Sequence, residues 1–340
     1  MNDSTRETAK VSSDIPAGVP AMMRAIAIEA YGPVETLREM KLQVLEPGEG
    51  EVLVRVHASS VNPLDWKIRS KQVPVNSKTG FPRVLGYDVS GVVVKAGPGV
   101  THVAEGDPVY GFLDYRRDGA NAEYVLTRDA FLSKKPETLS HPEAACIPLA
   151  ALTALQALKL KTNIQEGERL LVLGGSGGVG HFAVQIAKAY GLHVTATCSE
   201  KNADMVRGLG ADEVIAYDTG EVPDDARFDV IFDTVQTKSF KWAGPHLNSG
   251  GRFVGTFPDP GGLLKSKIGK WLGMKTSCHM VMVTPDHHGL RYLAEMVDKG
   301  RVKPVVQKVY PITELAEAHR VSADGHVVGK LAIDVAGVFG

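Results

Sequence analysis

A short apolar run that leads into a glycine-rich turn decides the fold: Leu170-Leu171-Val172-Leu173-Gly174-Gly175-Ser176-Gly177-Gly178-Val179-Gly180. Glycine lets a backbone turn tightly and approach a pyrophosphate, and a following helix presents unpaired N–H groups and the positive end of its dipole. Three of these glycines have GxxGxxG spacing, although ordinary strand-to-helix turns are also rich in glycine. A strand before, a helix after and a second strand at the right distance favour a dinucleotide-binding turn.

The segments that follow extend this unit into a sheet. We expect strands over 169–173, 193–197, 213–216, 230–233 and 252–256, and helices over 179–190 and 202–209. Strands that alternate with helices form βαβ units and hence a parallel sheet. Residues 258–275 are rich in Gly, Pro and Lys, which indicates a mobile loop or a short helix that could cover a site.

The first third of the chain is mainly β. Its apolar runs, separated by turn-forming Gly-Pro, Gly-Asp and Asp-Gly pairs, are at 25–28, 51–58, 89–94, 108–112 and 122–126. Alanine and leucine then dominate residues 145–158, which predicts buried helix and a domain boundary nearby. Towards the end of the chain we expect a helix over 289–299 and strands over 307–310 and 330–335.

Size and composition limit the possible classes of protein. A chain of 340 residues favours two domains. Its 38 basic and 39 acidic residues give no basic field of the kind that nucleic acid or an anionic membrane would demand, and no apolar run is long enough for a membrane span. The cysteines Cys146, Cys198 and Cys278 have no CxxC pair, which favours a reducing compartment. Residues 1–22 lack a signal-peptide core, so we expect a flexible tail and a cytoplasmic protein.

The end of the second strand indicates which dinucleotide binds. An Asp or Glu at this position would accept from the adenosine ribose and repel a 2′-phosphate, but the strand ends Thr195-Ala196-Thr197-Cys198-Ser199. Ser199, Lys201 and Asn202 offer a hydroxyl, a cation and an amide, so NADPH is preferred over NADH. Glu200 is expected to point to solvent. Tyr217 either flanks the adenosine or is an ordinary surface residue.

Three motifs resemble the medium-chain dehydrogenase/reductase superfamily: Gly174–Gly180, Pro148-Leu149-Ala150-Ala151-Leu152-Thr153-Ala154 and Gly86-Tyr87-Asp88-Val89-Ser90-Gly91. Residues 60–69 and 324–330 are similar to the quinone oxidoreductase branch, nearest to the chloroplast-envelope quinone oxidoreductase and alkenal/enone reductase subgroup. The resemblance implies an α/β fold with a GroES-like β-rich catalytic domain at 23–145 and 305–340. It also implies a doubly wound Rossmann domain for NADPH at 146–304.

The resemblance also implies that no metal is bound. Zinc-dependent members carry a cysteine ligand where this chain has Asn62 or a neighbour, and a His-Glu pair where it has Tyr87-Asp88. The four closely spaced cysteines of the structural zinc lobe are missing as well. Without a Lewis acid an alcohol dehydrogenase is disfavoured, whereas an electrophilic quinone or α,β-unsaturated carbonyl can accept hydride with less help. We therefore predict a zinc-independent, NADPH-dependent oxidoreductase.

Residues implied for catalysis are Lys67, Asn62 and Asp65. Lys67 stands where many quinone reductases have tyrosine, and a cation there would stabilise an oxyanion; an exposed loop lysine is the competing interpretation. Asp65 orients Lys67 or caps the turn. The cofactor-binding set is Thr153, Gly174, Gly175, Ser176, Gly177, Gly178, Val179, Ser199, Lys201, Asn202, Tyr217, Phe253, Gly255 and Lys330. For Thr153, Phe253 and Gly255, ordinary helix or strand packing is the competing interpretation.

Other functions stay open at this stage. The fold would also suit a catalytically weak protein that binds or senses NADPH. An enoyl-thioester reductase is a further alternative, because Lys265, Lys267 and Lys270 could form a basic entrance for a carrier. The physiological acceptor cannot be named from the sequence, and a homodimer is a reasonable expectation.

Overall fold

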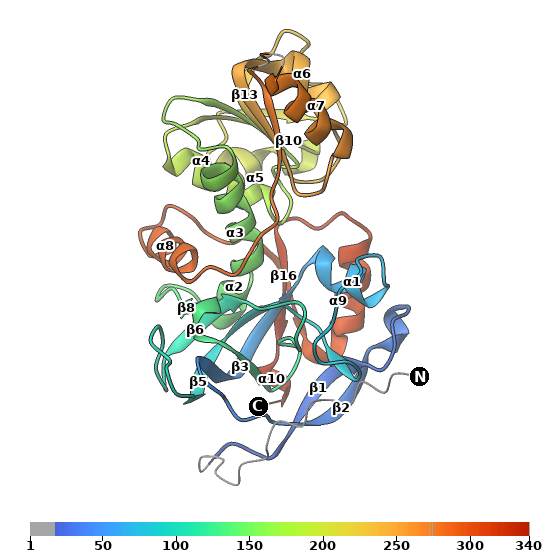
Figure 1. Ribbon diagram of the computed structural model, residues 1–340, viewed down its shortest axis with the longest axis vertical. Helices are drawn as coiled ribbons and strands as arrows, with labels where there is room; N and C mark the ends of the chain where they lie inside the picture. Colours follow the sequence, from blue (N-terminus) through green and yellow to red (C-terminus); the bar gives the residue numbers. More distant parts are fainter. Residues whose placement is uncertain (1–17, 272, 274, 340) are drawn as a thin grey trace. The chain divides into compact units, whose positions relative to one another are not determined.

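The computed structural model describes residues 18–271, 273 and 275–339 (Figure 1). They form two compact units. The first contains the described residues as far as Leu149, together with Pro285–Asp298 and the chain from Val306; the second contains Ala150–Thr284 and Lys299–Val305. Most of the expected flexible tail, residues 1–17, lies outside the described residues. The domain limits inferred from the sequence stay predictions.

Two sheets build the first unit. The described strands β1 (Met22–Ile28), β2 (Arg38–Gln43) and β4 (Arg83–Val84) pair in the order β2-β1-β4. The larger sheet has the order β15-β16-β3-β5-β6-β8, with β7 also paired to β3. Its strands are β3 (Glu51–Val61), β5 (Asp88–Ala96), β6 (Pro108–Phe112), β7 (Tyr124–Arg128), β8 (Leu132–Lys134), β15 (Val306–Pro311) and β16 (Lys330–Asp334).

Strand β3 is the centre of this larger sheet. It pairs with β5, β7 and β16, and its consecutive residues Val52, Leu53 and Val54 are all buried. A strand covered on both faces is expected to be apolar without alternation. Helices α1 (Pro63–Arg69), α2 (His141–Ala145), α8 (His287–Asp298), α9 (Leu315–Ala323) and α10 (Ala336–Phe339) complete the unit, with short 3₁₀ turns at Val34–Thr36, Asp129–Phe131 and Ile312–Glu314.

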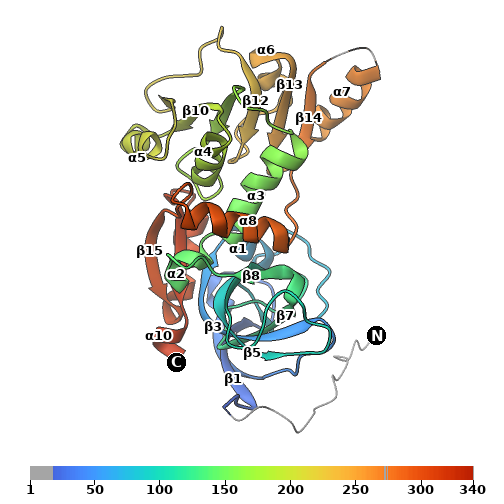
Figure 2. The ribbon, with the colours of Figure 1, turned by 90° about the vertical axis from the view of Figure 1, so that its left-hand side faces the viewer.

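The second unit holds one parallel sheet (Figure 2). Among the described residues its strand order is β11-β10-β9-β12-β13-β14. The strands are β9 (Arg169–Leu173), β10 (His193–Cys198), β11 (Glu213–Ala216), β12 (Phe228–Asp233), β13 (Leu247–Gly255) and β14 (Ser277–Met280). The helices are α3 (Pro148–Leu155), α4 (Gly180–Ala189), α5 (Ala203–Gly208), α6 (Phe240–His246) and α7 (Pro260–Trp271), with a π-helical turn η3 (Gln156–Lys161) and a 3₁₀ turn η4 (Glu200–Asn202).

The strands β9 and β12 share a core with α6. Leu171, Ile231 and Phe253 on adjacent strands pack with Phe240 of α6 in one buried cluster. Side chains alternate between the two faces of a strand, so the neighbouring residues of β9 point to the opposite face. This alternation of fully buried residues explains the continuous apolar run before the glycines.

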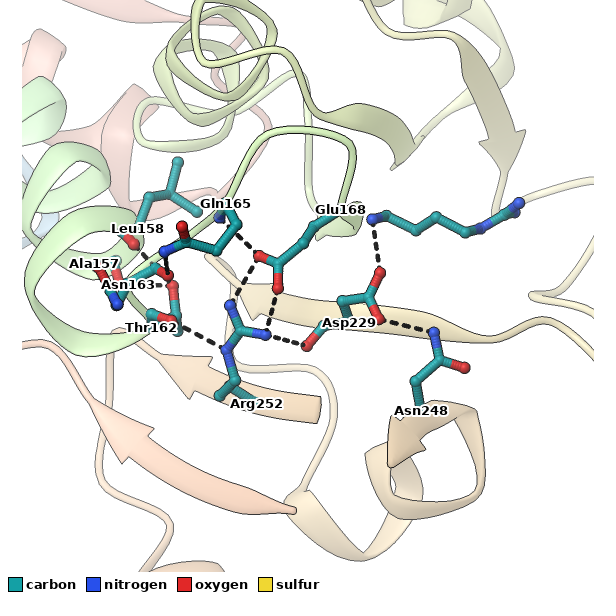
Figure 3. Close-up of polar contacts among 10 residues, drawn as sticks. Ala157, Leu158, Thr162, Asn163, Gln165, Glu168, Asp229, Asn248 and Arg252 are labelled. Carbon is teal, nitrogen blue, oxygen red and sulfur yellow. Dashed lines mark hydrogen bonds and ion pairs between the residues drawn. The ribbon is translucent and has the colours of Figure 1, made fainter. Parts of the chain in front are cut away.

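A half-buried arginine ties together the edge of the sheet where β9 begins (Figure 3). Arg252 donates to both carboxylate oxygens of Glu168 at 2.7 and 2.8 Å, and its Nε donates to the carbonyl of Thr162 at 2.9 Å. Thr162 directly follows η3, and its hydroxyl donates to the carbonyl of Leu158 at 2.9 Å. One guanidinium therefore holds the end of a helical segment against the start of a strand.

The expected β-rich first third and βαβ series are confirmed. Two expectations need refinement. The segment predicted as a loop or short helix over 258–275 contains the twelve-residue helix α7. The helix expected over 145–158 is divided into the end of α2, then α3 and the π-helical turn η3. The strand β2 was not predicted, because its charged residues Arg38, Glu39 and Lys41 obscure its alternation.

Candidate cofactor and active-site residues

The glycine-rich turn between β9 and α4 is too tight for side chains at two positions. Gly174 has φ +82°, in the left-handed region that favours glycine. A Cβ at Gly180 would lie 2.0 Å from the carbonyl oxygen of Gly174. The two outer glycines of the GxxGxxG motif thus allow the chain to fold back on itself as the helix begins.

Two threonines from neighbouring strands hold this turn. Gly174 N donates to Thr197 Oγ1 at 3.1 Å, and Gly175 N donates to the Thr197 carbonyl at 2.7 Å. On the other side, Thr234 Oγ1 donates to the carbonyl of Leu173 at 2.7 Å. No role was predicted for Thr197 or Thr234; their signal was a threonine at or just past a strand end beside the turn.

Two backbone N–H groups of this turn remain available to donate hydrogen bonds to a ligand. The described part of the chain offers no acceptor to the N–H groups of Gly178 and Val179. They stand immediately before α4, a ten-residue helix, where the helix dipole favours negative charge. The absence of side chains at Gly177 and Gly178 leaves the backbone accessible. These features fit a dinucleotide pyrophosphate.

Three polar side chains come together beside the turn. Asn202 Nδ2 donates to Ser199 Oγ at 3.0 Å and lies 3.4 Å from Ser176 Oγ. Glu200 is exposed, as expected, and its backbone N–H donates to Asp218. Lys201 is also exposed. The turn and the end of β10 therefore present hydroxyl and amide groups next to a cation, without a buried carboxylate among them.

Four other predicted cofactor residues also belong to the second unit. Phe253 belongs to the buried cluster under α6, and the carbonyl of Gly255 accepts from Val281 N at 3.0 Å. Thr153 is buried on α3. Tyr217 follows β11 and is 62% exposed, and its backbone N–H donates to the carbonyl of Cys198, next to Ser199, at 3.0 Å. The structure therefore places Tyr217 beside the end of β10 but does not group the other three with the polar side chains, and all four binding roles stay predictions.

A buried polar network occupies the first unit. Asp88 Oδ2 accepts from Asn62 Nδ2 at 2.8 Å and from Ser60 Oγ at 2.7 Å, and it lies 3.4 Å from Lys330 Nζ. Lys330 Nζ also donates to Asn62 Oδ1 at 2.5 Å. The other oxygen of Asp88 accepts from Leu149 N at 2.7 Å. Burial of this ion pair is tolerated because each charge is hydrogen-bonded.

Two of the predicted site residues, Asn62 and Lys330, are bound to other protein groups within this network. Asn62 has its amide oxygen and one amide hydrogen engaged, and Lys330 directs its ammonium to Asn62 and Asp88 rather than to solvent. Asp88 itself was not proposed as a functional residue. Its signal was an acid placed directly before a buried apolar strand, but its partner Lys330 is 242 positions away in the chain.

Asp65 lies in the first turn of α1 and is 1% exposed. Its carboxylate accepts from the backbone N–H of Asn62 at 2.6 Å, which is the capping role that the sequence allowed. Burial, aided by nearby Asp88, raises the pKa of Asp65 to about 7. At neutral pH this carboxyl group is therefore protonated in a large share of molecules.

Lys67 lies two residues further along α1 and is partly buried. Its Nζ is 5.3 Å from the centre of the Trp66 ring. Burial lowers the pKa of the Lys67 ammonium. A cation with a lowered pKa can both stabilise negative charge and release a proton more readily than a solvated lysine.

Comparison with known proteins places these features in a family. Residues 48–137 match the alcohol dehydrogenase GroES-like domain, and residues 209–333 match the zinc-binding dehydrogenase model. A mitochondrial NAD(P)H oxidoreductase of Mus musculus is 36% identical, over 92% of this chain and 89% of its own length. The chain belongs to the medium-chain dehydrogenase/reductase superfamily.

Several relatives within this superfamily are named as quinone or alkenal/one oxidoreductases. The chloroplast envelope quinone oxidoreductase homolog of Arabidopsis thaliana is 32% identical over 92% of this chain and 98% of its own. An NADPH-dependent alkenal/one oxidoreductase of the same plant is 33% identical over 97% and 84%. The structure of the quinone oxidoreductase from Coxiella burnetii matches with a TM-score of 0.83 at 30% identity, over 92% and 99%. The predicted family and fold are confirmed.

The comparisons also establish the general activity of this medium-chain reductase. It is an NAD(P)H-dependent oxidoreductase with a nicotinamide cofactor. The expected cytoplasmic location stays a prediction, because relatives are mitochondrial or chloroplastic. In the part of the chain that the structure describes, no helix is long and apolar enough to cross a membrane.

Proposed function

We propose that this protein transfers hydride from NADPH to a quinone or an α,β-unsaturated carbonyl without zinc. The observation that carries the proposal is the buried Asn62–Asp88–Lys330 network. By the resemblance, zinc-dependent members have metal ligands at or near Asn62 and at Tyr87-Asp88. An oxidoreductase without a Lewis acid needs an acceptor that is already electrophilic. The names of the relatives favour the same two classes of acceptor.

The residues in the network do not fit zinc. The carboxylate of Asp88 already faces the Lys330 ammonium, and a second cation at this place would be repelled by it. Asn62 supplies an amide where zinc prefers thiolate or imidazole. Burial raises the pKa of the Tyr87 phenol, so Tyr87 does not supply an anionic oxygen. Among the residues described, no three His, Cys, Asp or Glu side chains converge in a way that suits a metal.

The preference for NADPH rests on the end of β10. Ser199 and Asn202 present a hydroxyl and an amide, and Lys201 adds an exposed positive charge. All three can bind a 2′-phosphate. An NADH-specific site would instead need a carboxylate directed at the ribose, and the exposed Glu200 is not held in that way.

Lys67 is the proposed donor to the acceptor. A bound nicotinamide supplies the hydride, and the carbon that receives it leaves negative charge on the conjugated oxygen. The Lys67 ammonium stabilises that charge and transfers a proton to the oxygen, because burial has lowered its pKa. Asp65 and Asn62 fix the start of α1, and Lys67 lies in the last turn of the same short helix.

Absorbance assays with NADPH and NADH, each with a simple quinone and a short enone, test the proposal. Lys67→Met should lower kcat/KM about 100-fold, with partial recovery in Lys67→Arg. Lys201→Ala should raise the KM for NADPH about tenfold and leave the KM for NADH unchanged, since only NADPH has the 2′-phosphate. Lys241→Ala, an exposed lysine on α6, is the matched control.

Three results would contradict the proposal. Equal use of NADH and NADPH would remove the cofactor preference. Activity that disappears with chelators and returns with zinc would overturn the metal-free site. Tight NADPH binding without turnover of either acceptor would favour the alternative of a protein that binds or senses the cofactor.

A further inference from the structure

Helix α7 carries an exposed apolar stripe. Leu264, Ile268 and Trp271 are 60%, 49% and 86% exposed. Their spacing of four and three residues places them within an arc of about 60° on a helix with 3.6 residues per turn. Single exposed apolar residues are ordinary, but three large ones aligned on a helix form a contiguous patch.

The other face of α7 attaches the helix to the second unit. Ser266 Oγ accepts from the backbone N–H of Cys278 in β14 at 3.0 Å, and Leu263 packs against the cluster under α6. A Cβ at Gly262 would lie 2.7 Å from the Cβ of Phe240, so the helix approaches α6 closely there. Gly262, Leu263 and Ser266 thus anchor one face of the helix, and Leu264, Ile268 and Trp271 are on the exposed face. Figure 2 shows α7 beyond β14 at the end of the sheet.

Positive charge flanks the stripe on both sides. Lys265 and Lys267 are exposed, and on the helix they lie on opposite sides of the line from Leu264 to Trp271. The sequence from Gly261 to Lys275 contains four lysines and no acidic residue. The near-neutral balance of the whole chain, from which we expected no attraction to anionic membranes, conceals this local charge.

We propose that the exposed face of α7 docks the protein on an anionic lipid surface. Leu264, Ile268 and Trp271 enter the boundary between headgroups and acyl chains, and Lys265 and Lys267 pair with lipid phosphates. The helix lies in the plane of the interface and does not span the bilayer. This inference concerns an interaction surface and does not depend on the proposed acceptor or cofactor preference.

A second copy of the chain is a poorer occupant for this face. Two α7 helices that met through the stripe would bring their lysines together, and Gly261–Lys275 contains no carboxylate to neutralise them. A lipid surface provides apolar chains and negative phosphates in the same layered arrangement as the helix face.

Co-sedimentation of the full-length protein with vesicles tests the proposal. Vesicles of phosphatidylcholine mixed with phosphatidylglycerol should retain the protein, phosphatidylcholine alone should retain much less, and added salt should release it. Leu264→Ser combined with Ile268→Ser should lower the partition coefficient about tenfold or more. The matched control is Leu160→Ser, a leucine that is 71% exposed on η3, and it should bind as the wild type does.

Tryptophan emission locates the contact. Trp271 should shift to shorter wavelength when anionic vesicles are added, and Trp271→Phe should lose the shift but still co-sediment. Equal binding of the double variant and the wild type would overturn the proposal. So would self-association in the absence of lipid that the double variant abolishes, because a second copy would then cover the stripe. NADPH oxidation by the double variant in solution shows that it is folded.

Discussion

Gly180 begins α4 at the point where the chain doubles back over Gly174. We expect Gly180→Ala to destabilise the protein by about 2–4 kcal/mol, because its Cβ would overlap a backbone oxygen that cannot move without opening the turn. NADPH affinity should fall with it. Urea unfolding and NADPH titration measure the two effects. Gly208→Ala on α5 is the control, since nothing lies within 4 Å of its added Cβ; it should be neutral or stabilising by about 0.5–1 kcal/mol.

The Asp65 carboxyl group should make stability depend on pH. Its pKa is about 7 in the folded protein against 3.8 for the ordinary group, so between these values the folded state binds more protons than the unfolded state. The contribution of Asp65 to the free energy of unfolding is therefore fully present below pH 3.8. It is lost as the pH rises to about 7, by up to about 1.4 kcal/mol per pH unit.

Asp65→Asn removes this titration and keeps an oxygen for the N–H of Asn62. Urea unfolding across the same pH range should show that the variant gains stability relative to the wild type as pH increases. Parallel curves for the two proteins would show that Asp65 does not carry the predicted proton.

At the scale of elements, Arg252 joins β13, the start of β9 and the end of η3 (Figure 3). We expect Arg252→Met to cost about 2–4 kcal/mol, because it leaves the Thr162 carbonyl and one Glu168 oxygen without a donor, while the other Glu168 oxygen keeps the backbone N–H of Gln165. Arg252→Lys should recover only part of this, since lysine cannot form the paired contact with the carboxylate. A double-mutant cycle with Glu168→Gln, followed by urea unfolding, measures the coupling. Additive effects of the two changes would contradict it.

The elements around the cofactor turn were the most predictable part of the chain. The strand at 169–173 and that at 213–216 have the predicted limits, because both are apolar runs bounded by polar or turn residues. The turn itself was predictable because only glycine suits its backbone. What could not be predicted were contacts between distant residues, such as Arg252 with Glu168 and Asp88 with Lys330, because local pattern does not show which charged residues meet after folding.

At the scale of the molecule, buried histidines should make the first unit sensitive to acid. Burial lowers the pKa of His141 to about 4 and of His319 to about 3, against 6.5 for the ordinary group. Below pH 6.5 the unfolded state therefore binds more protons than the folded state, and stability decreases as the pH is lowered. In this pH range the two histidines act against the opposite effect of Asp65.

Replacing His141 with Gln tests this acid sensitivity. Between about pH 6 and pH 4 the variant should lose about 1.4 kcal/mol less per pH unit than the wild type, as followed by urea unfolding. His288→Gln, which replaces an exposed histidine, is the comparison. If both variants followed the wild-type curve, the acid loss would have another origin.

The pairing of β13 with β14 has a consequence for how such proteins diversify. The two strands are held in register from Arg252 opposite Ser277 to Gly255 opposite Met280, and α7 lies in the connection between them. Since only one face of α7 is anchored to the second unit, the residues on its exposed face can change without disturbing the glycine turn at the end of β9. Related reductases can therefore differ in the surface that this helix exposes, and so in what it binds, while they keep the same cofactor turn.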